Sequence, residues 1–320
     1  MTTRALVAIG VSAASVTLAA QTLPPGEAAP QVFRSGTHSV PVYASVSDPA
    51  GAFVLDLGQE EFRLRDNGKP QTITQFTSGV QPLSLLILID GSASMLQVLD
   101  SVLGAANSVV TRLLPEDRAA IASFADSFEM QQRFTSNRQE LLEHLGNQFD
   151  LRVAGETRLW EALTESVLTV GKEPGRRVVL VMTDGKQWTS EQGVLGVPAA
   201  EPTIAQAPES LVKLALDRHV LIYAIAVWTR EEKTEARPNR GIETLASLSG
   251  GGYVEMKASD RVNAMATQIM HELHQQYVLG FTPQVYDGKT HKLEVTVTRR
   301  GLTVRARTSY FAPRLAPDPR

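Results

Sequence analysis

Oxygen-bearing side chains follow an apolar segment in the stretch LSLLILIDGSASMLQVLDSV, residues 83–102. The apolar run is typical of a buried strand and stops at Asp90, and Ser92 and Ser94 follow before a helical pattern begins. One carboxylate and two hydroxyls at a strand tip suit a nucleophile, a phosphate-binding loop or a hard metal ion. Other parts of the chain have to decide among these three chemistries.

A second carboxylate stands at an equivalent place further along the chain. The buried-strand pattern RVVLVMTDG runs into Asp184, and Thr157 opens a predicted helix between the two strands. With Asp90, Ser92 and Ser94, these residues offer oxygen ligands beside strand ends, and hard cations prefer oxygen. Zinc is disfavoured because the chain has no cysteine and no histidine close to these positions. The sequence therefore favours Mg²⁺ or Mn²⁺ as the cofactor.

The competing chemistries lack residues that they need. A serine-hydrolase elbow has the pattern G-x-S-x-G, but Ser94 stands where the last glycine belongs. The phosphate-binding pattern G-x-x-x-x-G-K-[ST] is absent. A metal-dependent hydrolase is a weaker alternative, because no histidine belongs to the motif as a general base. Helix capping would explain the hydroxyl residues singly but not the whole set. We expect no enzyme activity and no catalytic residues.

The pattern of elements changes twice along the chain. Residues 38–80 predict short strands with a hairpin at Asn67-Gly68, and residues 276–313 predict strands again. Between them, over 81–275, apolar strands alternate with long helices. Near-continuous apolar strands indicate a mostly parallel sheet with helices on both faces, where sites form at the carboxyl ends of strands. We predict this α/β domain to be inserted in, or flanked by, a small β-sandwich-like domain.

The predicted elements of the central domain are as follows. Strands are expected at 83–89, 119–124, 177–183, 220–228 and 251–256, with 127–134 as an edge strand. Helices are expected at 95–113, 138–148, 157–171, 209–218, 241–249 and 260–275. After this domain, HKLEVTVTRR and LTVRARTSY are expected to form a hairpin turned at Arg300-Gly301, and a basic cluster there (Arg299, Arg300, Arg305 and Arg307) is expected to be a solvated strand face.

The amino terminus has the pattern of a secretory signal. Arg4 precedes an apolar, small-residue stretch, which predicts a signal peptide over residues 1–20, followed by a Pro/Ala-rich linker over 21–37. Residues 314–320 are a predicted tail. We expect no stable membrane span after cleavage and a secreted, periplasmic or cell-surface location. The formal net charge of −3 gives no reason to expect nucleic acid as a partner.

Taken together, the motifs resemble the von Willebrand factor type A domain. LILIDGSASM resembles the D-x-S-x-S motif of that family's metal-ion-dependent adhesion site (MIDAS), GETRLWEAL resembles its threonine loop, and VVLVMTDGK resembles its TDG strand end. LLPEDRAAIASFA, QRFTSNRQELLEHL and QQYVLGFTP further resemble bacterial VWFA-related proteins first grouped from Acidobacteria. The resemblance runs from about residue 38 to residue 313 and implies the Rossmann-like fold of that domain.

The resemblance also implies roles for the motif residues. Asp90 would bind the ion directly or through water, Ser92, Ser94 and Thr157 would offer hydroxyl oxygens, and Asp184 would act mainly through water. An open coordination position would then attract an Asp or Glu carboxylate of a protein partner.

The implied function is a non-enzymatic binding module, with an assembly or chaperone component of an envelope complex as the alternative. Loops 187–208 and 229–241 leave the carboxyl ends of strands and are expected to border the metal. Trp188 and Trp228 open these loops and are candidate partner contacts, although packing on top of the sheet would explain them equally well.

Overall fold

The structure is a computed structural model of the chain. The described residues are 39–149, 156–186, 207–231, 234–236, 238, 240–257 and 262–314. The predicted signal peptide, the linker and the tail lie outside them.

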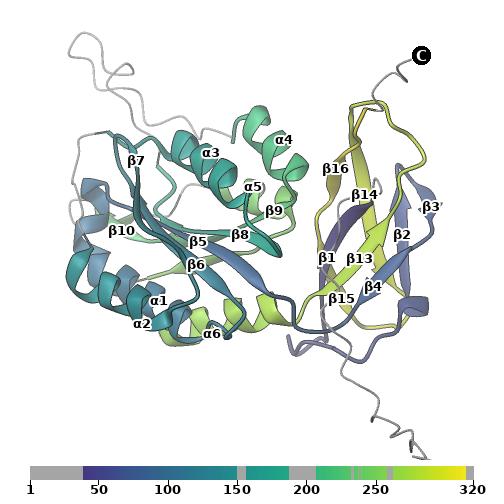
Figure 1. Cartoon of the computed structure of the whole chain (residues 1–320), viewed down its shortest axis with the longest axis horizontal. Helices are drawn as coiled ribbons and strands as arrows, with labels where there is room; N and C mark the ends of the chain where they lie inside the picture. The colour runs from purple at the N-terminus through teal and green to yellow at the C-terminus, as the bar shows by residue number, and fades with distance from the viewer. Residues whose placement is uncertain are drawn as a thin grey trace, which may run out of the picture. The chain divides into compact units, whose positions relative to one another are not determined.

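A six-stranded sheet forms the centre of the α/β domain (Figure 1). Its order is β12-β9-β8-β5-β6-β7, and every neighbouring pair is parallel except β6 and β7. The antiparallel edge strand β7 confirms the edge strand expected near 127–134. The bounds are β5 Leu83–Asp90, β6 Arg118–Phe124, β7 Phe128–Thr135, β8 Arg176–Thr183, β9 Val220–Val227 and β12 Tyr253–Met256.

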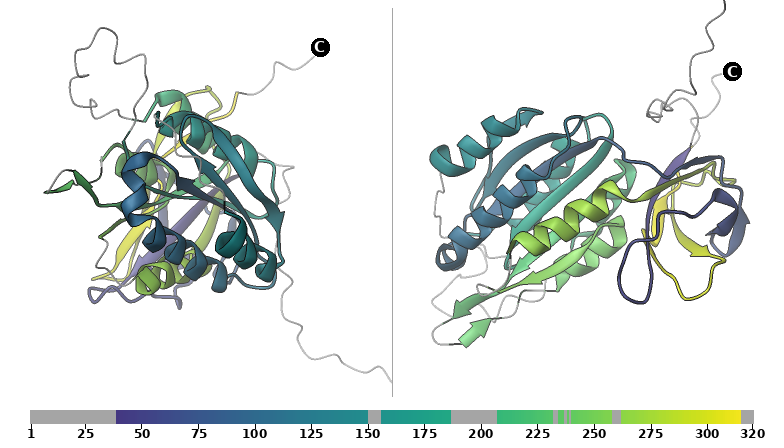
Figure 2. Two further views of the ribbon diagram at one scale, coloured as in Figure 1. Left: turned by 90° about the vertical axis from the view of Figure 1, so that its left-hand side faces the viewer. Right: turned by 90° about the horizontal axis from the view of Figure 1, so that it is seen from below.

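Helices cover both faces of this sheet (Figures 1 and 2). One face carries α1 (Leu99–Thr111), α2 (Arg138–Glu143) and α6 (Val262–His274), with α1 and α6 side by side. The other face carries α3 (Leu159–Val170), α4 (Glu209–Asp217) and α5 (Gly241–Ser249). The arrangement confirms the predicted α/β fold with a mostly parallel sheet.

Two predicted helices differ from the structure in their details. The helix expected from residue 95 starts as a 3₁₀ segment, η2 (Ala93–Val98), and becomes α-helical only at Leu99. The helix expected over 138–148 changes after Glu143 into a π-helical turn, η3 (His144–Gln148). Hydrophobic periodicity does not resolve these variants, because all of them place apolar side chains on one face over so few residues.

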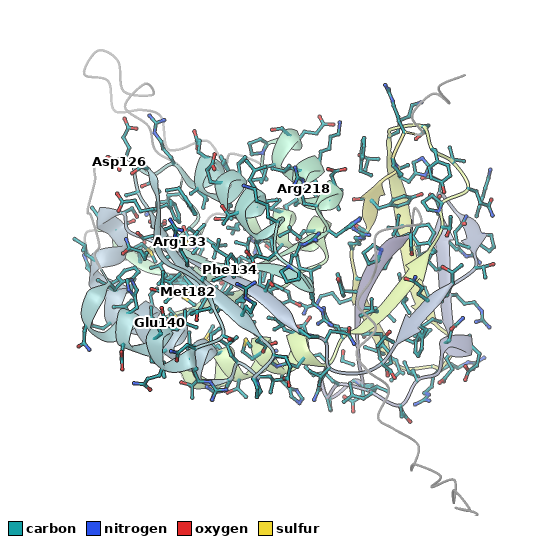
Figure 3. The ribbon with its side chains drawn as sticks, in the orientation of Figure 1. Asp126, Arg133, Phe134, Glu140, Met182 and Arg218 are labelled. Carbon is teal, nitrogen blue, oxygen red and sulfur yellow. The ribbon has the colours of Figure 1, made fainter. Side chains whose placement is uncertain are left out.

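Apolar side chains of the strands alternate between two cores. Leu85, Ile87 and Ile89 of β5 pack with α1 and α6, whereas Leu86 and Leu88 pack with α3. Met182 of β8 belongs to the first core and lies among its side chains (Figure 3). The strand sequence is apolar on both sides because both faces are covered, and the core holds the strand ends in fixed register.

One helical stretch of the described residues, Ala93–Thr111, is long and apolar enough to cross a membrane by length and composition alone. In the structure most of its apolar side chains belong to the core between the sheet and α6, whereas Leu96 is 47% exposed. The absence of a membrane span after the signal stays a prediction.

Strands from residues 38–80 (the first flank) and from residues 276–313 (the second flank) build a pair of four-stranded sheets around a shared apolar core. One sheet has the order β15-β1-β13-β4 and the other β16-β14-β2-β3, so each sheet takes strands from both flanks. The predicted β-sandwich-like domain is therefore present, while its end points at 38, 80, 276 and 313 stay predictions. The bounds are β1 Val40–Ser47, β2 Phe62–Asp66, β3 Lys69–Gln71, β4 Gln75–Thr77, β13 Tyr277–Phe281, β14 Thr290–Val297, β15 Thr303–Ala306 and β16 Ser309–Phe311.

The predicted hairpin turned at Arg300-Gly301 is wrong. β14 pairs with β2 and β16, whereas β15 pairs with β1 in the opposite sheet, so the chain crosses between sheets at this turn. A strand shows the same alternation of apolar and polar residues in either sheet. A glycine turn with positive φ, such as Gly301, is compatible both with a hairpin and with a crossing between the sheets. The hairpin expected at Asn67-Gly68 is confirmed, with φ of 47° and 80° at the two turn residues.

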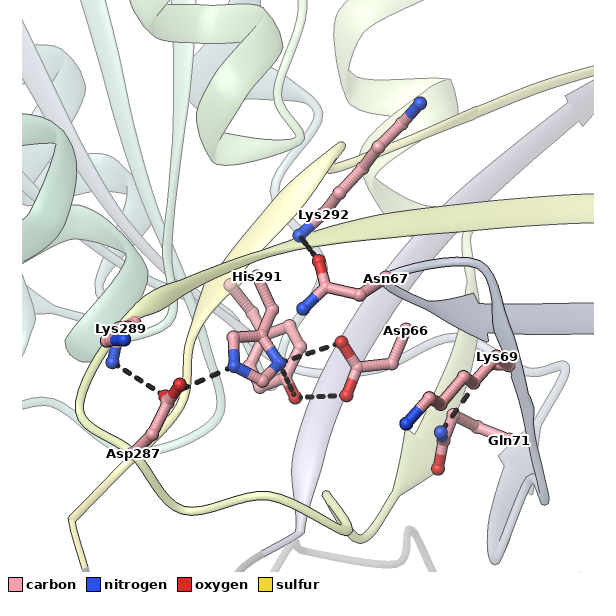
Figure 4. A network of polar contacts seen from close by, with 9 residues as sticks. Asp66, Asn67, Lys69, Gln71, Asp287, Lys289, His291 and Lys292 are labelled. Carbon is pink, nitrogen blue, oxygen red and sulfur yellow. Dashed lines mark hydrogen bonds and ion pairs between the residues drawn. The ribbon is translucent and has the colours of Figure 1, made fainter.

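A buried polar network joins the flanks inside the second sheet (Figure 4). His291 of β14 has Nδ1 2.8 Å from Asp66 Oδ1 and Nε2 3.1 Å from Asp287 Oδ1. The Tyr310 hydroxyl of β16 donates to Asp66 Oδ2 at 2.8 Å. Both ring nitrogens of His291 thus face carboxylate oxygens. The network ties β2 of the first flank to β14 and β16 of the second.

The C-terminal arginines do not form one solvated face. Arg299 is exposed but pairs with Asp56 and Glu61, and Arg305 forms an ion pair with Glu272 of α6. Arg307 is buried, contrary to the expectation from sequence, and its guanidinium donates to the Pro41 carbonyl. The charges of Arg299 and Arg305 are therefore paired with carboxylates of the chain itself.

Candidate functional site

Two neighbouring strands of the central sheet end in the candidate residues. β5 ends at Asp90, and β8 lies beside it in parallel, with Ile89 opposite Met182. Asp90 and Asp184 therefore emerge at the same edge of the sheet. Successive strands are added on opposite sides of β5, since β6 lies on one side and β8 on the other. The carboxyl ends of strands at such a switch point are where open α/β sheets bind ligands.

The carboxylate of Asp90 is fully buried and held at both oxygens. Oδ1 accepts the backbone N–H of Ser92 at 2.9 Å, and Oδ2 accepts the Thr183 hydroxyl at 2.6 Å. The pKa of Asp90 is raised to about 7, mainly by burial and secondly by the negative charge of Asp184. The hydrogen bonds from Ser92 and Thr183 act against this shift. Among the described residues, no basic side chain is in contact with the Asp90 carboxylate.

The carboxylate of Asp184 is the meeting point of the other polar groups. Its Oδ2 accepts the hydroxyls of Ser94 at 2.8 Å and Thr229 at 3.3 Å, and it lies 3.3 Å from Nζ of Lys186. Ser94 Oγ is also 3.2 Å from Ser92 Oγ. A continuous chain of polar contacts thus links Ser92, Ser94 and Asp184, and it stands beside the buried Asp90.

The hydroxyl residues are not used as helix caps. Ser92 precedes η2 without a hydrogen bond from its side chain to the segment, and α1 and α3 also lack side-chain caps at their starts. The capping alternative for Ser92, Ser94 and Thr157 is therefore not supported. Their side chains are left for contacts at the edge of the sheet.

Thr157 lies near this edge but is set apart from the other four residues. It is buried, and the neighbouring Arg158 N–H donates to the Ala125 carbonyl just after β6, at 2.8 Å. In the same region, Gly91 N–H donates to the Phe124 carbonyl at 2.7 Å. Among the described residues, no hydrogen bond joins Thr157 directly to Asp90, Ser92, Ser94 or Asp184. Hydrogen bonds thus link Asp90, Ser92, Ser94 and Asp184, whereas Thr157 lies beside the end of β6.

The donor set suits a hard cation. Asp90 and Asp184 are buried like charges, and neutral hydroxyls surround them, which is an oxygen environment of the kind that Mg²⁺ and Mn²⁺ bind. The described residues contain no cluster of three or more His, Cys, Asp and Glu side chains suited to a metal ion. An ion at this edge would therefore need the serine and threonine oxygens, and it would place a positive charge beside the buried Asp90.

The comparison with protein families covers this part of the chain. Residues 85–187 match the model of the von Willebrand factor type A domain, from within β5 to just past Asp184. The chain carries a von Willebrand factor type A domain. No curated protein matches the sequence.

Several solved structures resemble part of the chain. An aerotolerance-related membrane protein from Bacteroides fragilis is 16% identical, with a TM-score of 0.46 over 60% of this chain and 98% of that one. The vWF domain of the type V pilus tip protein Mfa5 from Porphyromonas gingivalis is 13% identical, with a TM-score of 0.47 over 61% of this chain and 95% of that domain. Proximal thread matrix protein 1 from the mussel byssus, with a zinc-occupied MIDAS motif, is 16% identical, with a TM-score of 0.48 over 65% and 49%.

Three residues that contact the candidate carboxylates were not among the predicted site residues. Thr183 binds Asp90, and Thr229 and Lys186 contact Asp184. Thr183 and Lys186 flank Asp184 in the motif itself, so their positions gave a signal, but only the fold shows which oxygen each one contacts. Thr229 lies 45 residues beyond Asp184 and opens loop 229–241, which was expected to border the site, but nothing in the sequence singles out this residue as the one that contacts Asp184.

The predicted partner contacts are only partly visible. Trp228 follows β9 and is half-buried; its indole N–H donates to Glu255 at 3.0 Å, and Lys257 Nζ lies 4.1 Å from the ring centroid. Trp188 and nearly all of loop 187–208 lie outside the described residues, whereas loop 229–241 begins with a short hairpin in which β10 (Thr229–Glu231) pairs with β11 (Thr234–Ala236). The contacts of Trp228 are those of a residue packed at the top of the sheet, and a role in partner binding stays a prediction.

Proposed function

We propose that the A domain binds Mg²⁺ or Mn²⁺ through Asp90, Ser92, Ser94, Thr157 and Asp184, and that the bound ion captures a carboxylate of a protein partner. The observation that carries this proposal is the pair of buried carboxylates on adjacent strand ends, surrounded by hydroxyl oxygens. A von Willebrand factor type A domain supports a role as a protein-interaction module. The ion and the chemistry of the partner are the added content of the proposal.

Electrostatics gives the reason for a carboxylate on the partner. With few charged ligands, a divalent ion keeps a net positive charge, and an anionic ligand completes its coordination better than water. The attraction strengthens when a partner covers the site, because the local dielectric constant falls. The proposed partner therefore presents an Asp or Glu side chain, and the neighbouring loops read the surface around it.

The proposal concerns binding rather than catalysis. His219 precedes β9 and His274 ends α6 beside Asp117, which precedes β6, so both lie at the amino ends of the strands, opposite Asp90. His291 is used in the β-sandwich. None of these three histidines is therefore placed to act as a general base at the site. A screen of hydrolase substrates with and without Mg²⁺ tests the hydrolase alternative.

The same proposal includes export from the cytoplasm. Residues 1–20 have the pattern of a signal peptide, and a partner would then be met in the periplasm, at the cell surface or outside the cell. An assembly component of an envelope complex is compatible with the same site. Affinity capture from the native envelope, with wild type and Asp90→Ala compared side by side, identifies the partner.

Thermal melting provides the direct test of the metal. Excess Mg²⁺ or Mn²⁺ is expected to raise the melting temperature relative to EDTA, with a stabilisation of about 2.7 kcal/mol at 100 times the dissociation constant. Asp90→Ala should abolish this rise and Thr157→Ala should reduce it. Zn²⁺ in the same assay tests the preference for the harder ions.

Asp126 offers a matched control. It follows β6 at the same end of the sheet, and its exposed carboxylate lies outside the proposed ligand set (Figure 3). Asp126→Ala should keep the full metal-induced rise. Identical melting curves of the wild type in EDTA and in excess Mg²⁺ and Mn²⁺ would contradict the proposal, and partner capture that survives both EDTA and Asp90→Ala would place the interaction on another surface.

A further inference from the structure

Lys186 places a positive charge on one of the proposed metal ligands. Its Nζ lies 3.3 Å from Asp184 Oδ2, where the Lys186 side chain is 25% exposed and the Asp184 side chain only 1%. The backbone N–H of Lys186 also donates to Asp184 Oδ1 at 3.2 Å. Both oxygens of this buried carboxylate are therefore in contact with Lys186.

The turn after β8 creates this contact. Gly185 has a φ of 77°, a left-handed conformation that glycine adopts without strain, and its N–H donates to the Thr183 hydroxyl at 2.9 Å. The turn folds the chain back, so that Lys186 comes over the carboxylate two residues before it. The contact is thus built into the backbone path and does not depend on a chance side-chain conformation alone.

We propose that Lys186 is an internal competitor of the metal ion. It neutralises Asp184 when the ion is absent, and it must leave this position when a divalent ion binds. The inference rests on the proposed function, since it requires that the site take a metal ion. Its consequence is that Lys186 sets the concentration of divalent ion at which the site fills, and hence the condition under which a partner can bind.

The competition follows from charge and from space. An ammonium group and a divalent cation within a few ångströms of one carboxylate repel each other strongly in a poorly hydrated site. The lysine is the group that can yield, because its stem is flexible and part of it already reaches solvent. Ser94 and Thr229, which contact the same oxygen, are neutral and can remain while the ion binds.

Metal affinity tests this role. The experiment titrates the whole protein with Mn²⁺ and follows the free ion by electron paramagnetic resonance, with Mg²⁺ measured by competition. Lys186→Met removes the charge and is expected to tighten Mn²⁺ binding by about tenfold or more. Lys186→Gln keeps a hydrogen-bond donor for Asp184 but removes the charge, and it should also tighten Mn²⁺ binding. Lys186→Arg keeps the charge and should stay within about threefold of the wild type.

Lys172 provides the matched charge control. It is exposed and precedes the amino end of β8, about 25 Å from the site by the length of an eight-residue strand. Lys172→Met changes the net charge of the protein equally and should leave Mn²⁺ affinity unchanged. Tightening in Lys172→Met equal to that in Lys186→Met would mean that net charge alone is responsible and would overturn the inference.

Melting in EDTA separates competition from a merely structural effect. Lys186→Met should melt at a lower temperature than the wild type in EDTA, because Asp184 loses its counter-charge, yet gain more from added Mn²⁺. Equal or weaker Mn²⁺ affinity in Lys186→Met and Lys186→Gln than in a metal-binding wild type would overturn this inference alone. A wild type that binds neither Mn²⁺ nor Mg²⁺ would overturn the proposed function and the inference with it.

Discussion

Asp90 and Asp184 differ in how their negative charge is balanced. Asp184 has the ammonium of Lys186 and two hydroxyls at its oxygens, whereas Asp90 has one hydroxyl and one backbone N–H. Both side chains are buried. The fold thus keeps two carboxylates out of water at one strand edge. Within the part of the chain that the structure describes, only Asp184 has a basic side chain in contact, which leaves Asp90 as the group that most needs a cation.

This difference predicts how the stability of the metal-free protein depends on pH. The pKa of Asp90 is raised to about 7 in the folded protein from 3.8, so the folded state binds more protons than the unfolded state between these values. Stability from this group is complete below about pH 4 and is lost as the pH rises through about 7. In EDTA, the wild type should therefore lose stability relative to Asp90→Asn as the pH is raised from 5 to 8.

Urea unfolding at several pH values measures this effect. Asp90→Asn is the matched variant, because it resembles the protonated carboxyl in shape and cannot ionise. The difference in unfolding free energy between the two proteins should shrink in excess Mg²⁺, since the ion stabilises the ionised carboxylate. A difference in EDTA that is the same at pH 5 and pH 8 would show that Asp90 does not titrate in this range.

Residues that act through local sequence could be predicted, and those that act through the fold could not. Asp90, Ser92 and Ser94 stand in one short segment, and the strand pattern before them fixes where they emerge. Thr229 reaches Asp184 only because β9 lies beside β8, which no spacing in the sequence reveals. The burial of Arg307 likewise depends on contact with Pro41, far away in the chain.

At the scale of elements, the strand ends opposite the site are fastened by one carboxylate. Asp117 is buried and precedes β6; its Oδ1 accepts the N–H of Leu83 at 2.9 Å, and its Oδ2 accepts that of Leu114 at 2.7 Å. His274 at the end of α6 lies 2.8 Å from the same Oδ2. His274 is therefore held in a joint between β5, β6 and α6.

The joint predicts a destabilising substitution. Asp117→Asn keeps the shape but replaces an acceptor oxygen by a donor, which leaves at least one buried N–H without its partner. We expect a loss of about 2 kcal/mol in the free energy of unfolding. Urea denaturation measures it, with Asp217→Asn as a control, because Asp217 is exposed at the end of α4 and its variant should stay within about 0.5 kcal/mol. Equal effects of the two substitutions would show that the joint contributes nothing.

The topology of the flanking strands marks the limit of sequence patterns at this scale. Strand positions at β1, β2 and β14 agreed with alternation of apolar and polar residues, because each has one face in the sandwich core. Alternation does not say which sheet a strand joins, so the crossing of the chain between β14 and β15 was missed. Pairing of β15 with β1, across some 260 residues, is a property of the assembled core.

At the scale of the whole molecule, the chain leaves the β-sandwich, builds the A domain and returns. The junction is polar and buried: Glu272 of α6 accepts the hydroxyls of Ser45 at 2.8 Å and Tyr223 at 2.9 Å and pairs with Arg305. Arg176 at the start of β8 donates to the Leu273 carbonyl and stacks over the Tyr43 ring at 4.8 Å. Groups from both flanks thus contact the helix that ends the A domain.

The interleaved sheets predict that the first flank does not fold alone. β1 pairs with β13 and β15, and β2 takes β14 as its partner besides β3, so a fragment of residues 38–80 keeps only one short hairpin pairing. An isolated two-stranded hairpin is marginal in water. A fragment of residues 81–276 retains both cores of the A domain and should fold. Amide NMR spectra of the two fragments test this, and residues 38–80 should give the narrow dispersion of an unfolded chain. Well-dispersed amide signals from 38–80 alone would show instead that the first flank is an independent domain and that its pairing with the second flank is not needed for folding.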